Sequence, residues 1–203
     1  MKIAVIGATG NAGSRIVTEL LNRGHQVLGI ARHPDKMQPR PGLTLTQGDV
    51  KDEPSLARLL MGQEAAIHSV RFLDTDAQSA IGAAKKSGVK RFLVVGGAGS
   101  LEVSPGAALI DQPNFPEVAR SEATAGRDFL NTLKTERDLD WTYLSPSAFF
   151  SPGERTGKFR IGKDELLARA DGQSKISMED YAIALADEIE SPKHSRQRFT
   201  VGY

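Results

Sequence analysis

The stretch VIGATGNAGSRI, residues 5–16, joins a short apolar run to a segment whose apolar residues have helical spacing. It contains three glycines at intervals of three residues, Gly7, Gly10 and Gly13. Glycine permits the positive φ of a sharp strand-to-helix turn, and its missing side chain lets backbone amides approach a phosphate at the helix N-terminus. A tight turn without a ligand would use the same glycines. The preceding strand and following helix favour dinucleotide binding.

The rest of the chain alternates short apolar runs with amphipathic segments. Strands are expected at 2–7, 25–32, 43–50, 64–70, 90–97 and 140–150, before a final run RFTVGY. Helices are expected after the glycines and at 54–60, 77–88, 120–136 and 177–190. This alternation predicts βαβ units, hence an α/β fold with a Rossmann-like, doubly wound parallel sheet. We expect one domain over residues 1–203, with residues 151–203 adding a small cap over the substrate side. The Gly/Pro-rich segments 100–117 and 151–167 cannot be assigned to helix or strand.

Composition excludes several classes of function. Lys and Arg number 26 against 25 Asp and Glu, a formal net charge of +1, which lacks the positive excess of a nucleic-acid binder. The absence of cysteine excludes disulfides and thiolate chemistry, and the four scattered histidines predict no metal site. No apolar stretch approaches the roughly 20 residues needed to cross a bilayer, and Met1 leads directly into a strand-like run. We therefore expect a cytoplasmic protein with neither nucleic-acid nor membrane partners.

The end of the second expected strand bears on the choice of dinucleotide. An acidic residue there accepts hydrogen bonds from a ribose 2′-hydroxyl, but this chain has Arg32, followed by His33 and Lys36. A guanidinium matches a 2′-phosphate bidentately, so the sequence favours NADPH over NADH. A solvated arginine leaving a strand is the alternative, and nearby Asp35 keeps NADH open.

Several motifs together resemble the atypical short-chain dehydrogenase/reductases, in the branch called NADH-flavin reductase-like or NmrA-like. These are GATGNAGS at the first turn, QGDVKD after the third strand, VKRFLVVGGAGS at the fifth and WTYLSPS at the sixth. The segments GERTGKFRIG, SKISMEDYAIALADEIE and RFTVGY also look like that branch, so the resemblance covers nearly the whole chain.

The resemblance implies a set of cofactor-binding residues along NADP, with NAD also possible. It places the pyrophosphate against Gly7, Thr9, Gly10, Asn11 and Ala12, and the 2′-phosphate against Arg32. It places the adenine beside Asp49 and Val50, and the ribose along Ser69 and Val70. The nicotinamide would approach Gly97, and its carboxamide side would contact Pro146 and Ser147.

Plainer roles compete for some of these residues. Asp49 could cap the helix expected near 54–60, and Pro146 could simply end a strand. The glycines around Gly97 could form only a flexible turn, although their number favours close ligand approach. His68, inside an apolar strand, is expected to be a core histidine rather than a catalyst.

One feature of the typical short-chain enzymes is missing. Those enzymes use a tyrosine followed four positions later by a lysine, which together move a proton to or from the substrate oxygen. Tyr143 is followed at that spacing by Ser147, Tyr181 by Leu185, and Tyr203 is the last residue. Ordinary alcohol–ketone chemistry by that dyad is therefore disfavoured, and Ser100 is left as the candidate hydroxyl for catalysis.

An acceptor that needs little help with protonation fits this pattern. We expect hydride transfer from NADPH to a flavin or similar planar acceptor, such as a quinone or bilin-like ring system, with FMN or FAD as substrate rather than bound group. Phe115, Phe149, Phe150 and Arg155 are candidate pocket walls. The alternative is an NmrA-like sensor that binds the dinucleotide without turnover. A monomer or homodimer is expected.

Overall fold

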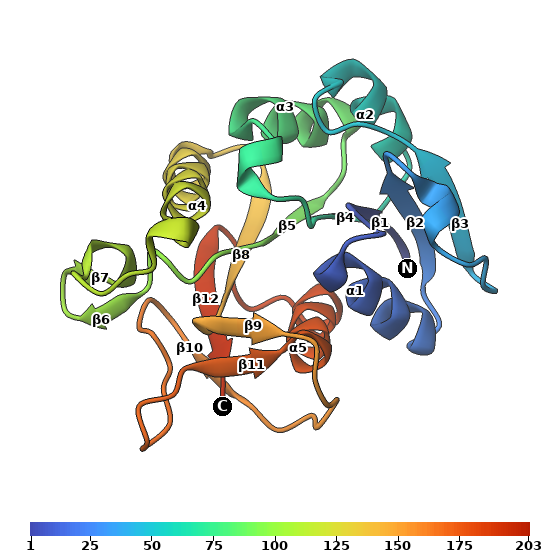
Figure 1. The fold of residues 1–203 in the computed structure, drawn as a ribbon. Coiled ribbons are helices and arrows are strands. Elements are labelled where there is room, and N and C mark those ends of the chain that lie inside the picture. The colour runs from blue at the N-terminus through green and yellow to red at the C-terminus, as the bar shows by residue number, and fades with distance from the viewer.

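The fold is built on an eight-stranded sheet, seen in a computed structural model that describes residues 1–203 (Figure 1). The strand order is β10-β12-β8-β5-β4-β1-β2-β3, and every pairing is parallel except that of β10 with β12. From β1 the chain runs outward to β3 on one side and then to β4, β5, β8 and β12 on the other. This reversal of strand order confirms the predicted doubly wound, Rossmann-like α/β fold.

The strands of the main sheet are three to seven residues long. Their bounds are β1 Lys2–Ile6, β2 Gln26–Ala31, β3 Leu43–Gln47, β4 Ala65–His68, β5 Arg91–Val95, β8 Asp140–Pro146, β10 Arg160–Gly162 and β12 Gln197–Gly202. The helices are α1 Asn11–Asn22, α2 Glu53–Leu60, α3 Ala77–Ser87, α4 Glu117–Thr135 and α5 Met178–Glu190, with short 3-10 turns η1 Pro34–Lys36, η2 Phe72–Asp74 and η3 Leu109–Asp111.

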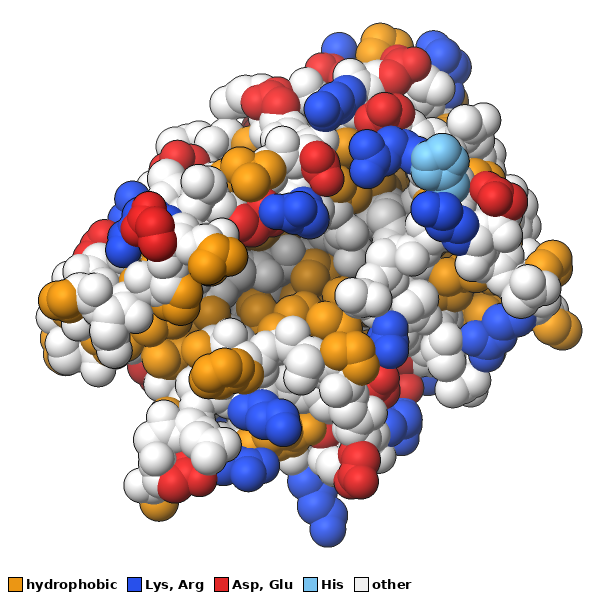
Figure 2. All heavy atoms as spheres, viewed as in Figure 1, with side chains coloured by type: hydrophobic (Ala, Val, Ile, Leu, Met, Phe, Trp, Pro, Cys, Tyr) orange, Lys and Arg blue, Asp and Glu red, His pale blue; other side chains and the backbone are white.

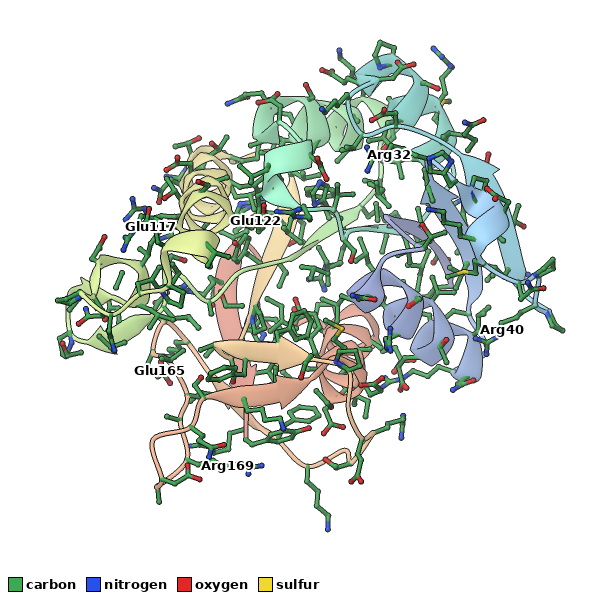
Figure 3. All side chains as sticks on the ribbon, in the orientation of Figure 1. Arg32, Arg40, Glu117, Glu122, Glu165 and Arg169 are labelled. Atoms are coloured by element: carbon green, nitrogen blue, oxygen red, sulfur yellow. The ribbon has the colours of Figure 1, made fainter.

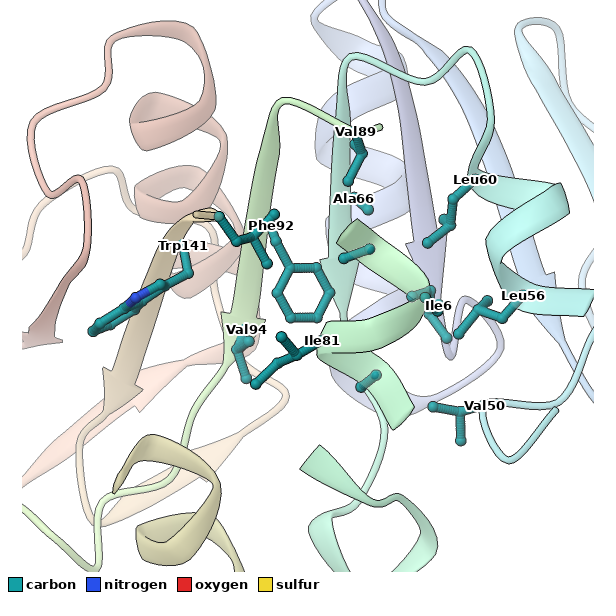
Figure 4. Close-up of a cluster of buried hydrophobic side chains, with 14 of the residues drawn as sticks. Ile6, Val50, Leu56, Leu60, Ala66, Ile81, Val89, Phe92, Val94 and Trp141 are labelled. Atoms are coloured by element: carbon teal, nitrogen blue, oxygen red, sulfur yellow. The ribbon is translucent and has the colours of Figure 1, made fainter. Parts of the chain in front are cut away.

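The helices form a layer on each face of the sheet. Helices α2, α3 and α4 cover one face, where Phe92 of the sheet packs with Leu56 and Ile81 (Figure 4). Tyr143 and Phe129 belong to the same buried cluster. On the other face α1 and α5 lie together over a second buried cluster. The two clusters bury the periodic apolar residues of the strands and helices, and thereby fix the register of each element.

The connection from β1 to α1 depends on close backbone approaches. Gly7 has φ +84°, and a Cβ built on it would lie 2.2 Å from the carbonyl oxygen of Ser69. A Cβ on Gly13 would lie 2.1 Å from the carbonyl oxygen of Gly7. Both positions therefore require glycine, which is why the turn is sharp enough to aim the start of α1 along the carboxyl edge of the sheet.

The two unassigned segments contain short strands outside the predicted pattern. Residues 100–117 form a small hairpin of β6 (Glu102–Ser104) and β7 (Ala107–Ala108), followed by η3. The strand expected over 140–150 is two strands, because the chain leaves the main sheet at Pro146 and continues as β9 (Phe149–Ser151). Strand β9 pairs with β11 (Lys175–Ser177) in a separate two-stranded sheet.

The segment expected to form a cap is divided between two structures. Strands β10 and β12 belong to the main sheet and α5 packs on α1, so much of residues 151–203 belongs to the core architecture instead. The remaining part is the loop before β10 and the β9–β11 pair. Arg155 in that loop departs from its expected place in an acceptor pocket, because its guanidinium donates to both carboxylate oxygens of Glu19 on α1, at 2.8 and 2.9 Å.

His68 ends β4 and is fully buried, as predicted for a core histidine. Its Nε2 lies 3.3 Å from the hydroxyl of Thr75, its Nδ1 has no hydrogen-bond partner in the protein, and its ring lies 5.2 Å from that of Phe129. Burial disfavours the charged ring and lowers the pKa of His68 from 6.5 to about 4. The imidazole is therefore neutral when the folded protein is at neutral pH.

The lowered pKa of His68 predicts a loss of stability in mild acid. Below its ordinary pKa the unfolded chain binds a proton that the folded chain resists, so the unfolding free energy should fall by about 2 kcal/mol between about pH 7.5 and about pH 5. Denaturant titrations at the two pH values, with His68→Leu as control, measure this contribution. The variant should show a pH dependence flatter by that amount; equal slopes would show that the buried imidazole does not resist protonation.

Candidate functional site

A cleft of about 280 Å³ lies at the carboxyl edge of the sheet, where the order of the strands reverses. It receives residues from the first glycine-rich turn and from the segments following β2, β3 and β4. The predicted residues that the structure brings together there are Gly7, Thr9, Gly10, Arg32, Asp49, Val50, Ser69 and Val70. This edge is where ligands bind in open α/β sheets.

The N-terminus of α1 presents backbone donors at the glycine-rich turn. Gly10 is the N-cap and has no side-chain cap, and the first helical bond runs from the amide of Ser14 to the carbonyl of Gly10. The preceding amides, those of Asn11, Ala12 and Gly13, have no acceptor within the protein. Together with the positive end of the helix dipole, these free donors suit an anion such as a diphosphate.

The far end of the cleft is rich in positive charge. Arg32, His33 and Lys36 reach it from the connection after β2, and Arg71 reaches it from the connection after β4. Asp35 does not line the cleft. These cations would suit a 2′-phosphate, and the contact of Arg32 with that group stays a prediction.

Asp49 and Val50 follow β3 at the side of the cleft. The carboxylate of Asp49 accepts from the amide of Lys51 at 2.9 Å. Asp52 is the N-cap of α2, because its carboxylate accepts from the amide of Ser55. The capping role considered for Asp49 is therefore wrong, and its exposed carboxylate is available to a ligand in the cleft.

The remaining predicted contacts lie outside this cleft. Gly97 follows β5, and its amide donates to the hydroxyl of Tyr143 at 3.1 Å. A Cβ on Gly97 would meet only the ring of Phe72, at 3.9 Å, so this backbone faces open space beside η2. Pro146 does end β8, and Ser147 is buried with its hydroxyl donating to the carbonyl of Val201.

No tyrosine hydroxyl is free to act as a catalytic acid. Tyr143 is buried, and its hydroxyl donates to the carbonyl of Gly126 at 3.1 Å. Tyr181 is also buried and donates to the carbonyl of Leu144 at 2.7 Å. Burial raises the pKa of both phenols well above the ordinary range. Tyr203 is held between Ser177 and Asp180 in the C-terminal region.

Ser100 follows β5 but does not line the cleft. Its hydroxyl accepts from Arg198 at 3.2 Å, and the same guanidinium contacts Asp164. The side chain of Arg198 is almost fully buried, and no local signal in the sequence predicts its contact with Ser100. The catalytic role of Ser100 stays a prediction.

Sequence reasoning also missed the residue that holds the η2 turn beside the cleft. Glu122, on α4, accepts from the amides of Phe72 and Leu73 at 2.7 and 3.2 Å. Figure 3 shows Glu122 on one side of this turn and Arg32 on the other. Phe72 and Glu122 are 50 residues apart in the sequence, so no short motif could predict this contact.

A hollow lies in the middle of the face shown in Figure 2, over β5 and β8 and between α4 and β9. Hydrophobic side chains gather along its floor and lower rim. In β9, Phe149 is 68% exposed, whereas Phe150 is half-buried against the ring of Tyr181. Phe115 is half-buried beside Arg120. An apolar surface next to a nucleotide cleft suits a flat organic ligand.

Fold and site together define a Rossmann-type protein for nicotinamide dinucleotides. Residues 7–192 match the family model described as NAD(P)H-binding, and the chain belongs to this family. This confirms the resemblance to the atypical short-chain dehydrogenase/reductases.

Three similar proteins match this chain over nearly its whole length. "Uncharacterized protein YwnB" of Bacillus subtilis is 39% identical over 99% of this chain and 98% of its own length. A "putative epimerase" from Bacteroides thetaiotaomicron is 41% identical, with a TM-score of 0.95, covering 100% of this chain and 96% of that one. A "putative NADH-flavin reductase" from Streptococcus pneumoniae is 35% identical, with a TM-score of 0.87, covering 100% and 99%.

None of the helices combines the length and the apolar composition that crossing a membrane requires.

The open space at Gly97 predicts a variant that separates fold from function. Gly97→Ala should fold like the parent, because the new methyl group has its nearest neighbour at 3.9 Å, yet it should weaken nicotinamide-dependent turnover by about tenfold or more. Thermal melting and steady-state kinetics with NADPH measure the two effects. Gly96→Ala is the contrasting variant, because its Cβ would lie 2.3 Å from the ring of Tyr143 and should lower the melting temperature. Parental turnover by Gly97→Ala would contradict the assigned approach of the nicotinamide.

Proposed function

We propose that this protein is an NAD(P)H-dependent reductase that transfers hydride from NADPH to a flavin or a similar planar acceptor. One observation carries the proposal: the η2 turn borders both the nucleotide cleft and Gly97, while every tyrosine hydroxyl is engaged within the protein. Arg71 and Asp74 of this region line the cleft, and Phe72 lies next to Gly97. Donor and acceptor rings would therefore meet beside the open backbone of Gly97, where no tyrosine hydroxyl is free to act as an acid.

The chemistry requires the protein to hold two rings together more than to move a proton. Bound NADPH supplies the hydride, and a conjugated acceptor stabilises the resulting charge within its own ring system. The chain's contribution is orientation, with reacting atoms about 3–3.5 Å apart, which alone supplies a large share of the rate enhancement. The hydroxyl of Tyr143 supports this role by accepting a hydrogen bond from the amide of Gly97, which holds that backbone in place.

The NADH-flavin reductase relative and the apolar hollow support flavin as the acceptor class. In this proposal FMN or FAD is a substrate that leaves after reduction. The exposed Phe149 is the residue of β9 best suited to stack on such a ring, because 68% of its surface is accessible.

The proposal of NADPH as the preferred donor rests on Arg32. A charge-assisted bidentate contact with the 2′-phosphate is worth about 1.5–3 kcal/mol, which corresponds to about tenfold to a hundredfold in affinity. Arg32→Asp should weaken NADPH binding by that factor and NADH binding by less than about threefold. Isothermal titration calorimetry with both nucleotides measures the difference. Equal effects on NADPH and NADH would refute the role of the guanidinium.

The acceptor assay decides between an enzyme and a sensor. Purified protein is mixed with NADPH and then with FMN, FAD or a small quinone, and the absorbance of the reduced nicotinamide is followed. An acceptor-dependent loss of absorbance, saturable in both substrates, is expected. Tight binding of NADPH by calorimetry in the same preparation, with no loss of absorbance for any acceptor, would instead support an NmrA-like dinucleotide sensor.

A further inference from the structure

An ion pair lies at the positively charged end of the nucleotide cleft. Nη2 of Arg32 lies 4.0 Å from Oδ2 of Asp74, and both residues line the cleft. Arg32 follows β2, whereas Asp74 ends η2, which follows β4. Strand β1 lies between β2 and β4 in the sheet, so the pair reaches from one side of the glycine-rich turn to the other.

The two partners differ in how firmly they are held. Phe72 is 8% exposed, its ring lies 5.4 Å from that of Phe129, and Glu122 accepts from the first two amides of η2. The amide of Asp74 itself donates to the carbonyl of Arg71 at 3.0 Å. The side chain of Arg32 is 63% exposed and has no other partner in the protein. The backbone that carries Asp74 is therefore held by its turn, and the more exposed guanidinium of Arg32 is the group that can change partner.

The charges around this pair make the competition for Arg32 selective between a 2′-phosphate and a 2′-hydroxyl. Asp49 and Asp74 are the carboxylates that line the cleft, and Asp74 is the one paired with a cation there. Arg71, the cation next to η2, is paired in turn with Glu122 at 3.6 Å. A 2′-phosphate that binds the guanidinium of Arg32 must displace the carboxylate of Asp74, and the two anions repel each other. A 2′-hydroxyl is uncharged and meets no such repulsion.

We propose that Asp74 is a specificity-determining residue that lowers the preference for NADPH over NADH by competing with the 2′-phosphate for Arg32. The inference rests on the proposed role of Arg32 and adds a residue to it. In many Rossmann proteins the acidic residue that governs this choice ends the second strand. Here the acidic residue comes from the connection after the fourth strand, and the arginine takes the place at the second.

The test is the variant Asp74→Asn, which keeps the size of the side chain and removes its charge. The dissociation constant of NADPH should fall by about threefold to tenfold, and that of NADH should change by less than about twofold. Calorimetry at low and high salt measures both, and thermal melting confirms the fold. An unchanged constant for NADPH, or an equal gain for NADH, would overturn the proposal.

Asp35→Asn is the matched control. It removes the same charge from the same side of the molecule, at a residue that is exposed and does not line the cleft. Its effect on NADPH should stay below about twofold, because a solvated charge at a distance is screened by salt. An equal gain from Asp35→Asn would assign the effect to net charge and would overturn the role of Asp74.

A double-mutant cycle with Arg32→Ala tests the mechanism. Without the guanidinium there is nothing to compete for, so Asp74→Asn should change NADPH binding by less than about twofold in this background. A gain as large as in the parent would contradict competition for Arg32. If Arg32→Ala alone weakens NADPH and NADH equally, Arg32 does not contact the 2′-phosphate, and the proposed role of Arg32 is overturned. A cycle in which Arg32→Ala weakens NADPH selectively but shows no coupling to Asp74→Asn would overturn the role of Asp74 alone.

Discussion

The closeness of two backbone segments at the first turn governs the arrangement of the site. Gly7 lies against the carbonyl of Ser69, and Gly13 lies against the carbonyl of Gly7, with no room for a Cβ at either position. These contacts bring the end of β1, the end of β4 and the start of α1 to one point. The free amides of Asn11, Ala12 and Gly13 face the carboxyl edge of the sheet as a consequence. A diphosphate bound there would satisfy donors that the fold itself leaves unpaired.

The C-terminal region supports this arrangement from the same face of the sheet as α1. Helix α5 packs on α1, and the loop before β10 is tied to both helices through buried carboxylates. Glu19 of α1 accepts from Arg155, and Asp180 of α5, which is fully buried, accepts from the amides of Thr156 and Gly157. Hydrogen bonds from Arg155 lower the pKa of Glu19, so this carboxylate stays charged at neutral pH. The loop thereby holds α1 against the sheet.

The sequence predicted the features that depend on periodicity and on glycine. The alternation of apolar runs located the main strands and helices, because burial on both faces of a parallel sheet leaves a continuous apolar signal. It failed for β6, β7, β9, β10 and β11, which are two or three residues long and too short to show any period. It also joined β8 and β9 into one strand, because the apolar run continues through the bend after Pro146.

The candidate site was predictable where contacts are local and not where they are remote. The glycine-rich turn, Arg32, Asp49 and Val50 follow strand ends, and the parallel topology brings those ends together. The partners of Arg32 and Ser100 were not predictable. Asp74 lies 42 positions after Arg32, and Arg198 lies 98 positions after Ser100, so only the folded chain shows these pairs.

Amide-resolved NMR during titration with NADPH tests the central claim most directly. The claim is that bare main-chain donors at the start of α1 bind the diphosphate. It predicts that the largest shifts occur at the amides of Asn11, Ala12 and Gly13, and that inorganic pyrophosphate reproduces them at higher concentration. Saturable binding of NADPH that leaves these three amides unshifted would contradict the account.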